Sequence, residues 1–335
     1  MKYLVTGATG FIGTRVTRQL LAEGHEVRAL VRTPARAHEL QAAGAQLAEG
    51  DVTDLPSVRN AMGGCDGVFH LAGWYRLGVR DASPAEKINV DGTRNVLQAM
   101  KEASVPRGVY TSTVAIYSDT RGQMVDETHR MEDRYLSVYE ATKARAHQVA
   151  LDYIKDGLPL VVVLPGAVYG PGDESPVGAS LRKYLQRRLP LLPRDSEMCW
   201  AHVDDTAHAH LLAMQKGRAG EAYIIAGPRH TVTEVMNTAV RLTRIPPPRI
   251  QVSARVIRAL AQIMAMLERV APIPADYTSE YLRATGAATY LGDNTKARKE
   301  LGYVPRDIDS GLVDTLRADM KRLNLPLPPQ LAPGP

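Results

Sequence analysis

The sequence has only two cysteines, Cys65 and Cys199, and no apolar run of membrane-spanning length. Two isolated cysteines provide neither a disulfide framework nor the spacing of a metal site, so we expect free thiols in a reducing compartment. The best apolar candidate, VIRALAQIMAMLERV (256–270), is interrupted by Arg258, Glu268 and Arg269. Because a spanning helix needs about 20 apolar residues, stable membrane insertion is not expected.

A secretory leader is also missing, because Met1-Lys2 leads directly into an apolar strand pattern. The formal net charge of +5 is spread along the 335 residues, except for the basic segment RKYLQRR (182–188). A solvated helix face explains this segment better than a nucleic-acid site does. We therefore expect a cytoplasmic protein that binds no nucleic acid.

Segment 256–270 has the spacing of an amphipathic helix. The favoured interpretation is a helix that packs in the core or against a second subunit. The alternatives are the wall of an apolar substrate pocket or a contact with a membrane surface.

Short apolar runs alternate with segments of helical period through the first half of the chain. Runs of this kind are typical of strands buried on both faces of a parallel sheet, with helices as right-handed crossovers. The strands are expected near 2–7, 25–31, 45–52, 66–73, 107–113 and 158–166, and the helices up to 23 and near 35–43, 84–102 and 137–155. The sequence predicts an α/β fold with a doubly wound parallel sheet.

The alternation stops after Pro165, where Gly, Pro and charged residues become frequent. We assign residues 1–165 and about 200–228 to the sheet domain. A smaller, interleaved C-terminal domain takes 166–199 and about 229–323. The proline-rich tail 324–335 cannot build a core, so we expect it to be disordered or draped over the surface.

The motif TGATGFIG (6–13) follows the first strand and opens the first helix. In that context Gly7 permits a tight turn, Gly10 lets the backbone approach a pyrophosphate, and Gly13 lets helix and sheet pack closely. The helix N-terminus adds N–H donors and positive potential. The motif predicts a dinucleotide cofactor, in contact with Gly7, Thr9, Gly10, Phe11 and Ile12.

The end of the second predicted strand bears on the choice of dinucleotide. NAD is usually held there by an acidic residue, but this chain has Val31-Arg32. Arg32, with Arg36 nearby, can pair with the 2′-phosphate of NADP, so NADP(H) is preferred and NAD(H) remains possible. In the next strand-end motif, Asp51 can bind the adenine amino group and Val52 can pack on the ring; a helix-capping turn explains that motif equally well.

Tyr139 and Lys143 of YEATK lie four residues apart on a predicted helix, so both project from one face. A neighbouring ammonium and an oxidised nicotinamide favour the phenolate and lower its pKa, which allows Tyr139 to exchange a proton with a substrate oxygen. The strand end VYTSTVAIY (109–117) offers Thr111, Ser112 and Thr113 to hold that oxygen. Spacing alone does not choose among these three hydroxyls.

The ordered set TGATGFIG, DVTD, FHLAG, INVDGTRNVL, YTSTVAIY, YEATK, LPGAVYGPGD, HVDDTAHA and LGYVPR resembles an extended short-chain dehydrogenase/reductase. Among its branches the chain most resembles dihydroflavonol-4-reductase-like enzymes, which share their scaffold with the NAD-dependent epimerase/dehydratase family. The resemblance implies a Rossmann fold with a C-terminal substrate domain, and a homodimer formed through the helices near 84–102 and 137–155.

The resemblance also implies the site residues. It makes Tyr139 the proton donor, Lys143 its lysine and also a cofactor ligand, and Thr113 the hydroxyl, with Ser112 in reserve. Asn89 is structural or part of a proton relay. The resemblance further places these residues beside the cofactor: Leu71, Ala72, Gly73, Pro165, Gly166 and Val168. Residues expected to line the substrate pocket are Trp74, Tyr75, Arg76 and Tyr169.

Three functions remain open. Nucleotide-sugar members usually carry Arg and Asn where this chain has Leu164 and Ala167, which favours an NADP-dependent reductase of an apolar or aromatic small-molecule carbonyl, such as a ketone, aldehyde or dihydroflavonol. An epimerase or dehydratase with tightly bound NAD is the first alternative. A regulatory protein that only senses the dinucleotide is the second; such sensors typically lack the Tyr and Lys pair.

The motif HVDDTAHAH (202–210) raises the question of a metal site. On a helix His208 and His210 point about 200° apart, and no histidine pair with i, i+4 spacing is formed. A structural role is therefore predicted and no metal is expected.

Overall fold

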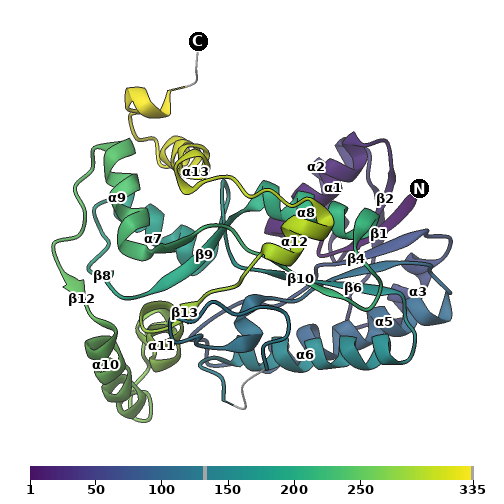
Figure 1. Cartoon of the computed structure of the whole chain (residues 1–335), viewed down its shortest axis with the longest axis horizontal. Helices are drawn as coiled ribbons and strands as arrows, with labels where there is room; N and C mark the ends of the chain where they lie inside the picture. The colour runs from purple at the N-terminus through teal and green to yellow at the C-terminus, as the bar shows by residue number, and fades with distance from the viewer. Residues whose placement is uncertain (131–133, 333–335) are drawn as a thin grey trace.

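A parallel sheet of seven strands forms the centre of the larger half of the molecule (Figure 1). The computed structural model describes residues 1–130 and 134–332. The strand order is β10-β6-β5-β4-β1-β2-β3, and every pairing is parallel. The strands are β1 (Lys2–Thr6), β2 (Glu26–Val31), β3 (Gln46–Glu49), β4 (Gly67–His70), β5 (Gly108–Thr111), β6 (Leu160–Pro165) and β10 (Ala222–Ile225). The predicted doubly wound sheet is confirmed.

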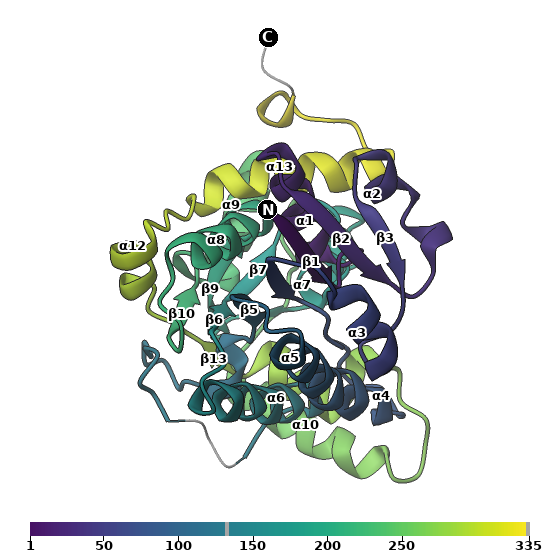
Figure 2. The same ribbon diagram turned by 90° about the vertical axis from the view of Figure 1, so that its right-hand side faces the viewer.

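Two layers of helices cover this sheet, one on each face (Figure 2). The lower layer contains α3 (Leu55–Met62), α5 (Gly92–Glu102) and α6 (Val138–Lys155). The upper layer contains α1 (Phe11–Ala22), α2 (His38–Ala42), α8 (Val203–Lys216) and α12 (Thr295–Leu301). Successive strand residues point to opposite faces, so Leu4 packs in the lower core and Val5 in the upper one.

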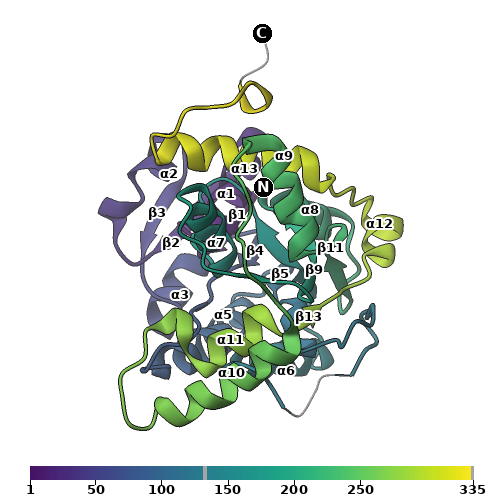
Figure 3. The same ribbon diagram turned by 90° about the vertical axis from the view of Figure 1, so that its left-hand side faces the viewer.

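The smaller half is built on a second sheet, in which β9 (Glu197–His202) pairs with three short strands. These partners are β7 (Ala167–Tyr169), β11 (Arg229–Thr231) and β13 (Thr289–Tyr290). The helices α7 (Pro176–Leu185), α9 (Val232–Thr243) and α13 (Ile308–Arg322) enclose a third core (Figure 3). This half is connected to the large sheet at the carboxyl end of β6, because β7 begins two residues after β6 ends.

Two further helices lie at the outer end of the smaller half. α10 (Ala254–Leu267) packs on α11 (Ser279–Gly286), and Figures 1 and 3 show α10 at the periphery of the molecule. The remaining elements are short: β8 (Leu192–Pro193), β12 (Gln251–Val252), α4 (Ser83–Ala85), and single turns at Pro34–Arg36, Val114–Tyr117, Ala275–Tyr277 and Pro329–Leu331. Within the described ranges, no helix combines the length and apolar character needed to cross a bilayer.

Two local features differ from a simple interpretation of the sequence. The helix expected near 84–102 contains a π-helical segment, Glu86–Asp91, before α5. α12 lies within the segment 229–323 expected in the smaller domain, but its Ala297 and Leu301 pack in the upper core of the large sheet.

Residues 324–332 of the proline-rich tail are draped over the smaller half. Leu331 is fully buried there, and Arg317 Nε donates to its carbonyl oxygen at 2.8 Å.

Candidate active site

The glycine turn joins β1 to α1 at the carboxyl edge of the large sheet. Gly7 has φ +70°, and a Cβ there would lie 2.7 Å from the backbone nitrogen of Ala72. A Cβ at Gly13 would lie 2.0 Å from the Gly7 oxygen, whereas one at Gly10 would meet only that same oxygen, at 3.1 Å. Gly10 is the N-cap of α1 and no side chain caps the helix. The turn therefore leaves backbone N–H groups free to bind a pyrophosphate, and the fold brings Thr9, Phe11 and Ile12 to the same edge.

Two arginines follow the end of β2. Arg32 and Arg36 are both exposed, and neither forms an ion pair with a carboxylate among the described residues. Asp51 Oδ1 accepts hydrogen bonds from the Thr53 N–H and hydroxyl, each at 2.9 Å, in a turn of its own. The helix cap is the next acidic residue, Asp54, which accepts from Ser57 N. Val52 is buried against Gly92 of α5.

The strand end at Leu71, Ala72 and Gly73 is fixed to the lower helices by Asn89. Asn89 Oδ1 accepts from Trp74 N at 2.7 Å, and its Nδ2 donates to Trp74 O at 3.1 Å and to Thr142 Oγ1 at 2.9 Å. The Asn89 carbonyl lies in the π-helical segment and accepts from Thr93 Oγ1 at 2.6 Å. The side-chain bonds of Asn89 link the 71–74 segment to Thr142 of α6. Both roles expected for Asn89, structural or in a proton relay, stay predictions.

Three neighbouring hydroxyls at the end of β5 point to three different partners. Thr111 Oγ1 lies 2.9 Å from His210 Nε2, and Ser112 Oγ lies 2.9 Å from His147 Nδ1. Thr113 Oγ1 accepts from the Ala115 N–H at 3.2 Å, and its hydroxyl also acts on the pKa of the Tyr139 phenol. The geometry therefore brings Thr113, rather than Ser112, to Tyr139.

Tyr139 and Lys143 lie in the first half of α6, with Ser137 as its N-cap. Burial raises the pKa of Tyr139 to about 12, although the Thr113 hydroxyl opposes the shift. Burial lowers the pKa of Lys143 to about 7. Lys143 Nζ donates to Thr111 O at 2.7 Å and to Tyr110 OH at 3.3 Å. Desolvation is the largest influence on the phenol. The lowering of its pKa by the ammonium together with an oxidised nicotinamide stays a prediction.

The residues expected beside the substrate and nicotinamide divide into two groups. Tyr75 is 45% exposed, and its ring centroid lies 4.5 Å from that of Tyr139; Trp74 is half-buried and Arg76 is exposed on the same loop. Pro165, Gly166 and Val168 form the junction from β6 to β7. Tyr169 corrects the expectation, because its side chain is 1% exposed and packs against Trp200, His202 and α13 inside the third core.

Two carboxylates that the sequence patterns did not single out hold the site together. Glu140 is 1% exposed; its Oε1 accepts from Tyr290 OH at 2.7 Å, and its Oε2 from Ser118 Oγ at 3.0 Å and Leu136 N at 2.9 Å. Burial raises the pKa of Glu140, against these hydrogen bonds. Glu280 of α11 accepts from Gly78 N at 2.8 Å and Val138 N at 2.7 Å. The one local signal was a glutamate inside YEATK.

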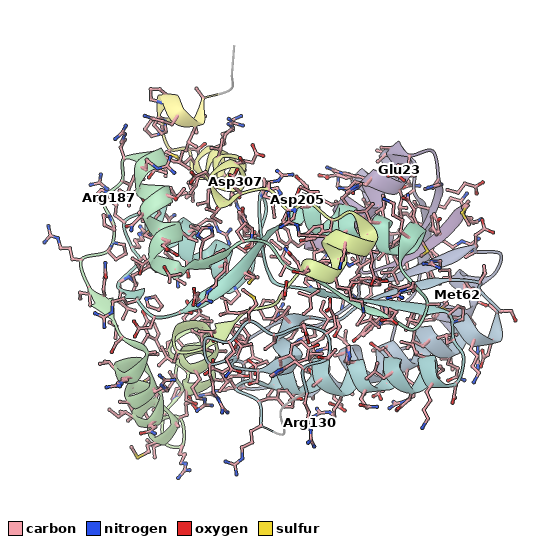
Figure 4. The ribbon with its side chains drawn as sticks, viewed as in Figure 1. Glu23, Met62, Arg130, Arg187, Asp205 and Asp307 are labelled. Atoms are coloured by element: carbon pink, nitrogen blue, oxygen red, sulfur yellow. The ribbon has the colours of Figure 1, made fainter. Side chains whose placement is uncertain are left out.

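The His and Asp side chains of HVDDTAHAH that were considered as metal ligands have separate partners. Asp205 binds Arg306 through both of its carboxylate oxygens, with a shortest distance of 2.7 Å; Asp205 and the adjacent Asp307 lie where the two halves meet (Figure 4). His202 caps α8, and His210 contacts Thr111 and the Thr206 carbonyl. Among the described residues, no three His, Cys, Asp or Glu side chains gather as a possible metal site.

Residues 3–226 match the model of the NAD dependent epimerase/dehydratase family. The chain belongs to this family. Its glycine turn, Tyr139 and Lys143 lie within the matched residues. The protein is an NAD(P)-dependent enzyme of the extended short-chain dehydrogenase/reductase type.

Curated relatives of this family member match over nearly its whole length. A putative dihydroflavonol 4-reductase from Synechocystis sp. is 32% identical, covering 94% of this chain and 93% of the relative. A 4-hydroxy-2-methyl-3-oxo-4-farnesyl-3,4-dihydroquinoline-1-oxide ketoreductase from Stigmatella aurantiaca is also 32% identical, covering 95% and 96%. Among solved structures, the NAD-bound dTDP-glucose 4,6-dehydratase DesIV double mutant from Streptomyces venezuelae is 26% identical with a TM-score of 0.78, covering 96% and 97%.

Proposed function

We propose that this protein is an NADP-dependent reductase that converts a carbonyl group of an apolar small molecule to an alcohol, with Tyr139 as the proton donor. The observation that carries the proposal is the placement of the Thr113 hydroxyl at the carboxyl end of β5 near the Tyr139 phenol, with Lys143 one helical turn further along α6. A hydroxyl pair at this edge can bind and protonate one carbonyl oxygen.

The protonation state of Tyr139 suits reduction. With a pKa near 12, its phenol is neutral at physiological pH and has a proton to give. When bound, the reduced nicotinamide supplies a hydride to the carbonyl carbon. Tyr139 gives its proton to the oxygen, Thr113 orients that oxygen, and the resulting phenolate is reprotonated from solvent. Once the phenolate forms, its negative charge would favour the protonated form of the buried Lys143, and the ammonium would in turn favour the deprotonated phenol between the two steps.

The preference for NADP rests on the end of β2. Arg32 and Arg36 are exposed without ion-pair partners in the described part of the chain, and charge-assisted bonds from arginine suit a 2′-phosphate. Lys143 would hold the nicotinamide ribose, and the glycine turn the pyrophosphate.

The apolar substrate is supported by the β6 end. Leu164 is fully buried and Ala167 carries no polar group, so neither can bind a nucleotide sugar. Relatives named as reductases of a dihydroflavonol and of a farnesylated quinoline oxide support a hydrophobic carbonyl substrate in this protein as well. The DesIV structure holds NAD, which keeps an epimerase or dehydratase with tightly bound NAD as the alternative to test.

The test is cofactor consumption by the purified protein with ketones, aldehydes and dihydroflavonols, using NADPH and NADH in parallel. Tyr139→Phe is expected to lose activity by about 10²- to 10⁴-fold, whereas Tyr153→Phe, on the same helix, retains it. Arg32→Asp is expected to lower kcat/KM for NADPH at least about tenfold without the same loss for NADH, with Arg80→Asp, on an exposed loop, as control. If neither cofactor is consumed and denaturation releases NAD, the reductase proposal is wrong and the epimerase alternative replaces it; cofactor binding with no turnover of any kind would favour the sensor.

A further inference from the structure

The large apolar side chains that the described residues expose are concentrated in one short region, the segment from Ile250 to Tyr277. This region contains α10 and the loops on either side of it. Its exposed members are Ile250, Val256, Leu260, Ile263, Met266, Leu267, Val270 and Tyr277. Contiguous exposed apolar surface of this kind marks an interaction site.

On α10 these side chains form a stripe with helical spacing. Val256, Leu260, Ile263 and Leu267 follow one another at intervals of four, three and four residues, so they share one face. Leu260 is 38% exposed and Ile263 50%. The opposite face carries Ala254, Ile257 and Ala261, which are buried. The helix therefore has one apolar face packed in the protein and a second one in contact with solvent.

The charged side chains near the stripe divide by sign. Arg249, Arg255, Arg258 and Arg269 are all exposed, and none forms an ion pair within the described part of the chain, although Arg258 donates to the Ala287 carbonyl at 3.4 Å. The acidic residues are engaged: Glu268 by the Ser279 N–H at 2.5 Å and hydroxyl at 3.1 Å, Asp276 by Lys183 at 2.5 Å, and Asp195 by Arg194 at 3.2 Å and the Ala254 N–H at 3.0 Å. The charge left without an ion pair around α10 is therefore positive, which together with the apolar stripe favours a partner that is both apolar and negatively charged.

A second copy of this chain does not meet that requirement. A two-fold interface brings the same surface of both subunits together, so the exposed arginines around one α10 would lie close to those around the other. An anionic lipid surface offers phosphates to the arginines and acyl chains to the stripe. We propose that α10 docks this protein on an anionic lipid surface, lying in the plane of the interface with Val256, Leu260, Ile263 and Leu267 inserted.

Docking through α10 would place the active site next to the lipid. α10 packs on α11, and Glu280 of α11 binds the backbone of the Tyr75 loop and the first turn of α6. An apolar carbonyl compound dissolved in the lipid would then enter beside Tyr139 without crossing water. This consequence rests on the proposed reductase function, but the docking itself does not.

The test is co-sedimentation of the full-length protein with vesicles of phosphatidylcholine, with and without phosphatidylglycerol. Wild type is expected to bind the phosphatidylglycerol vesicles, and more weakly at high salt because the charges are screened. Leu260→Glu/Ile263→Glu is expected to reduce binding at least about tenfold. Val304→Glu is the matched control, because this residue is 77% exposed but lies far along the chain from α10; it should bind like wild type.

Circular dichroism and thermal melting of each variant show whether it is folded, and the wild-type result does not depend on any variant. Absence of binding by folded wild-type protein, or equal loss in Val304→Glu and in the α10 variant, overturns the proposal. A dimer in light scattering that Leu260→Glu/Ile263→Glu dissociates, without vesicle binding by wild type, would show a second copy as the occupant. None of these results requires turnover, so failure of the reductase proposal is scored separately.

Discussion

The helices α6 and α10 depart from the usual distribution of polar and apolar residues in opposite directions. α6 buries Glu140, Thr142, Lys143 and His147, whereas α10 exposes Val256, Leu260, Ile263 and Met266. Buried polar groups and exposed apolar patches are the informative exceptions to ordinary packing. The buried polar groups of α6 lower stability, and the exposed apolar groups of α10 lower solubility. Each exception coincides with a proposed interaction: with the substrate for α6 and with lipid for α10.

The largest effect should come from removing the buried charge of α6. Lys143→Met keeps the length and apolar stem of the side chain but removes the ammonium, and we expect kcat/KM to fall by about 10²- to 10⁴-fold. The melting temperature should hold or rise, because a costly buried charge is replaced by an apolar group. Steady-state kinetics checks the fall in kcat/KM, and thermal melting checks the melting temperature. Unchanged kinetics would indicate that the buried polar residues of α6 have a structural role only.

The same lysine should make stability depend on pH. Its pKa falls from 10.5 to about 7 on folding, so between these values the folded state binds fewer protons than the unfolded state. The free energy of unfolding should therefore rise with pH across that window, by at most about 5 kcal/mol. Urea unfolding of wild type and Lys143→Met at several pH values isolates this contribution, since parallel profiles would mean that Lys143 is not desolvated.

Substitution of Glu140 should have a smaller effect than substitution of Lys143, and the effect should be on stability. Glu140→Gln keeps one acceptor oxygen and replaces the other by an NH₂ group. Either the Tyr290 hydroxyl or the Ser118 hydroxyl and Leu136 N–H therefore lose their acceptor. We expect a loss of about 1–3 kcal/mol in urea unfolding. Glu102→Gln removes an exposed ion pair between Glu102 of α5 and Arg59 of α3, and it should cost clearly less because the pair lies in solvent. Equal costs at the two positions would contradict the distinction between buried and exposed carboxylates.

The smallest effect is expected on the exposed face of α10. Ile263→Ala should change the free energy of unfolding by less than about 0.5 kcal/mol, because its side chain is already half in solvent. Ile257→Ala, on the buried face of the same helix, should cost about 2–4 kcal/mol. A large cost at Ile263 in the isolated protein would show that the stripe is covered by protein rather than left for a partner.

The sequence alone predicted the elements that depend on local patterns. The parallel strands follow from apolar runs, and the glycine turn and the Tyr139–Lys143 pair follow from short spacings. The contacts around Glu140 were not predictable, because Tyr290 approaches it from 150 positions along the chain. The burial of Tyr169 likewise depends on α13, and Asn89 of the π-helical segment contacts Thr142, 53 positions along the chain. Such features arise from long-range packing, which no periodicity in the sequence encodes.

The carboxylate of Glu280 has a consequence for how the site opens. One oxygen holds the Tyr75 loop and the other holds the amide that directly precedes Tyr139. An outward movement of α11 would break both hydrogen bonds together. The mobility of the Tyr75 loop and the order of the first turn of α6 would therefore change in a single equilibrium rather than in two. A molecule that binds beneath the Tyr75 loop and holds the loop in place should also act on α6 through Glu280. It should lower the hydrogen-exchange rate of the backbone amides at the start of α6.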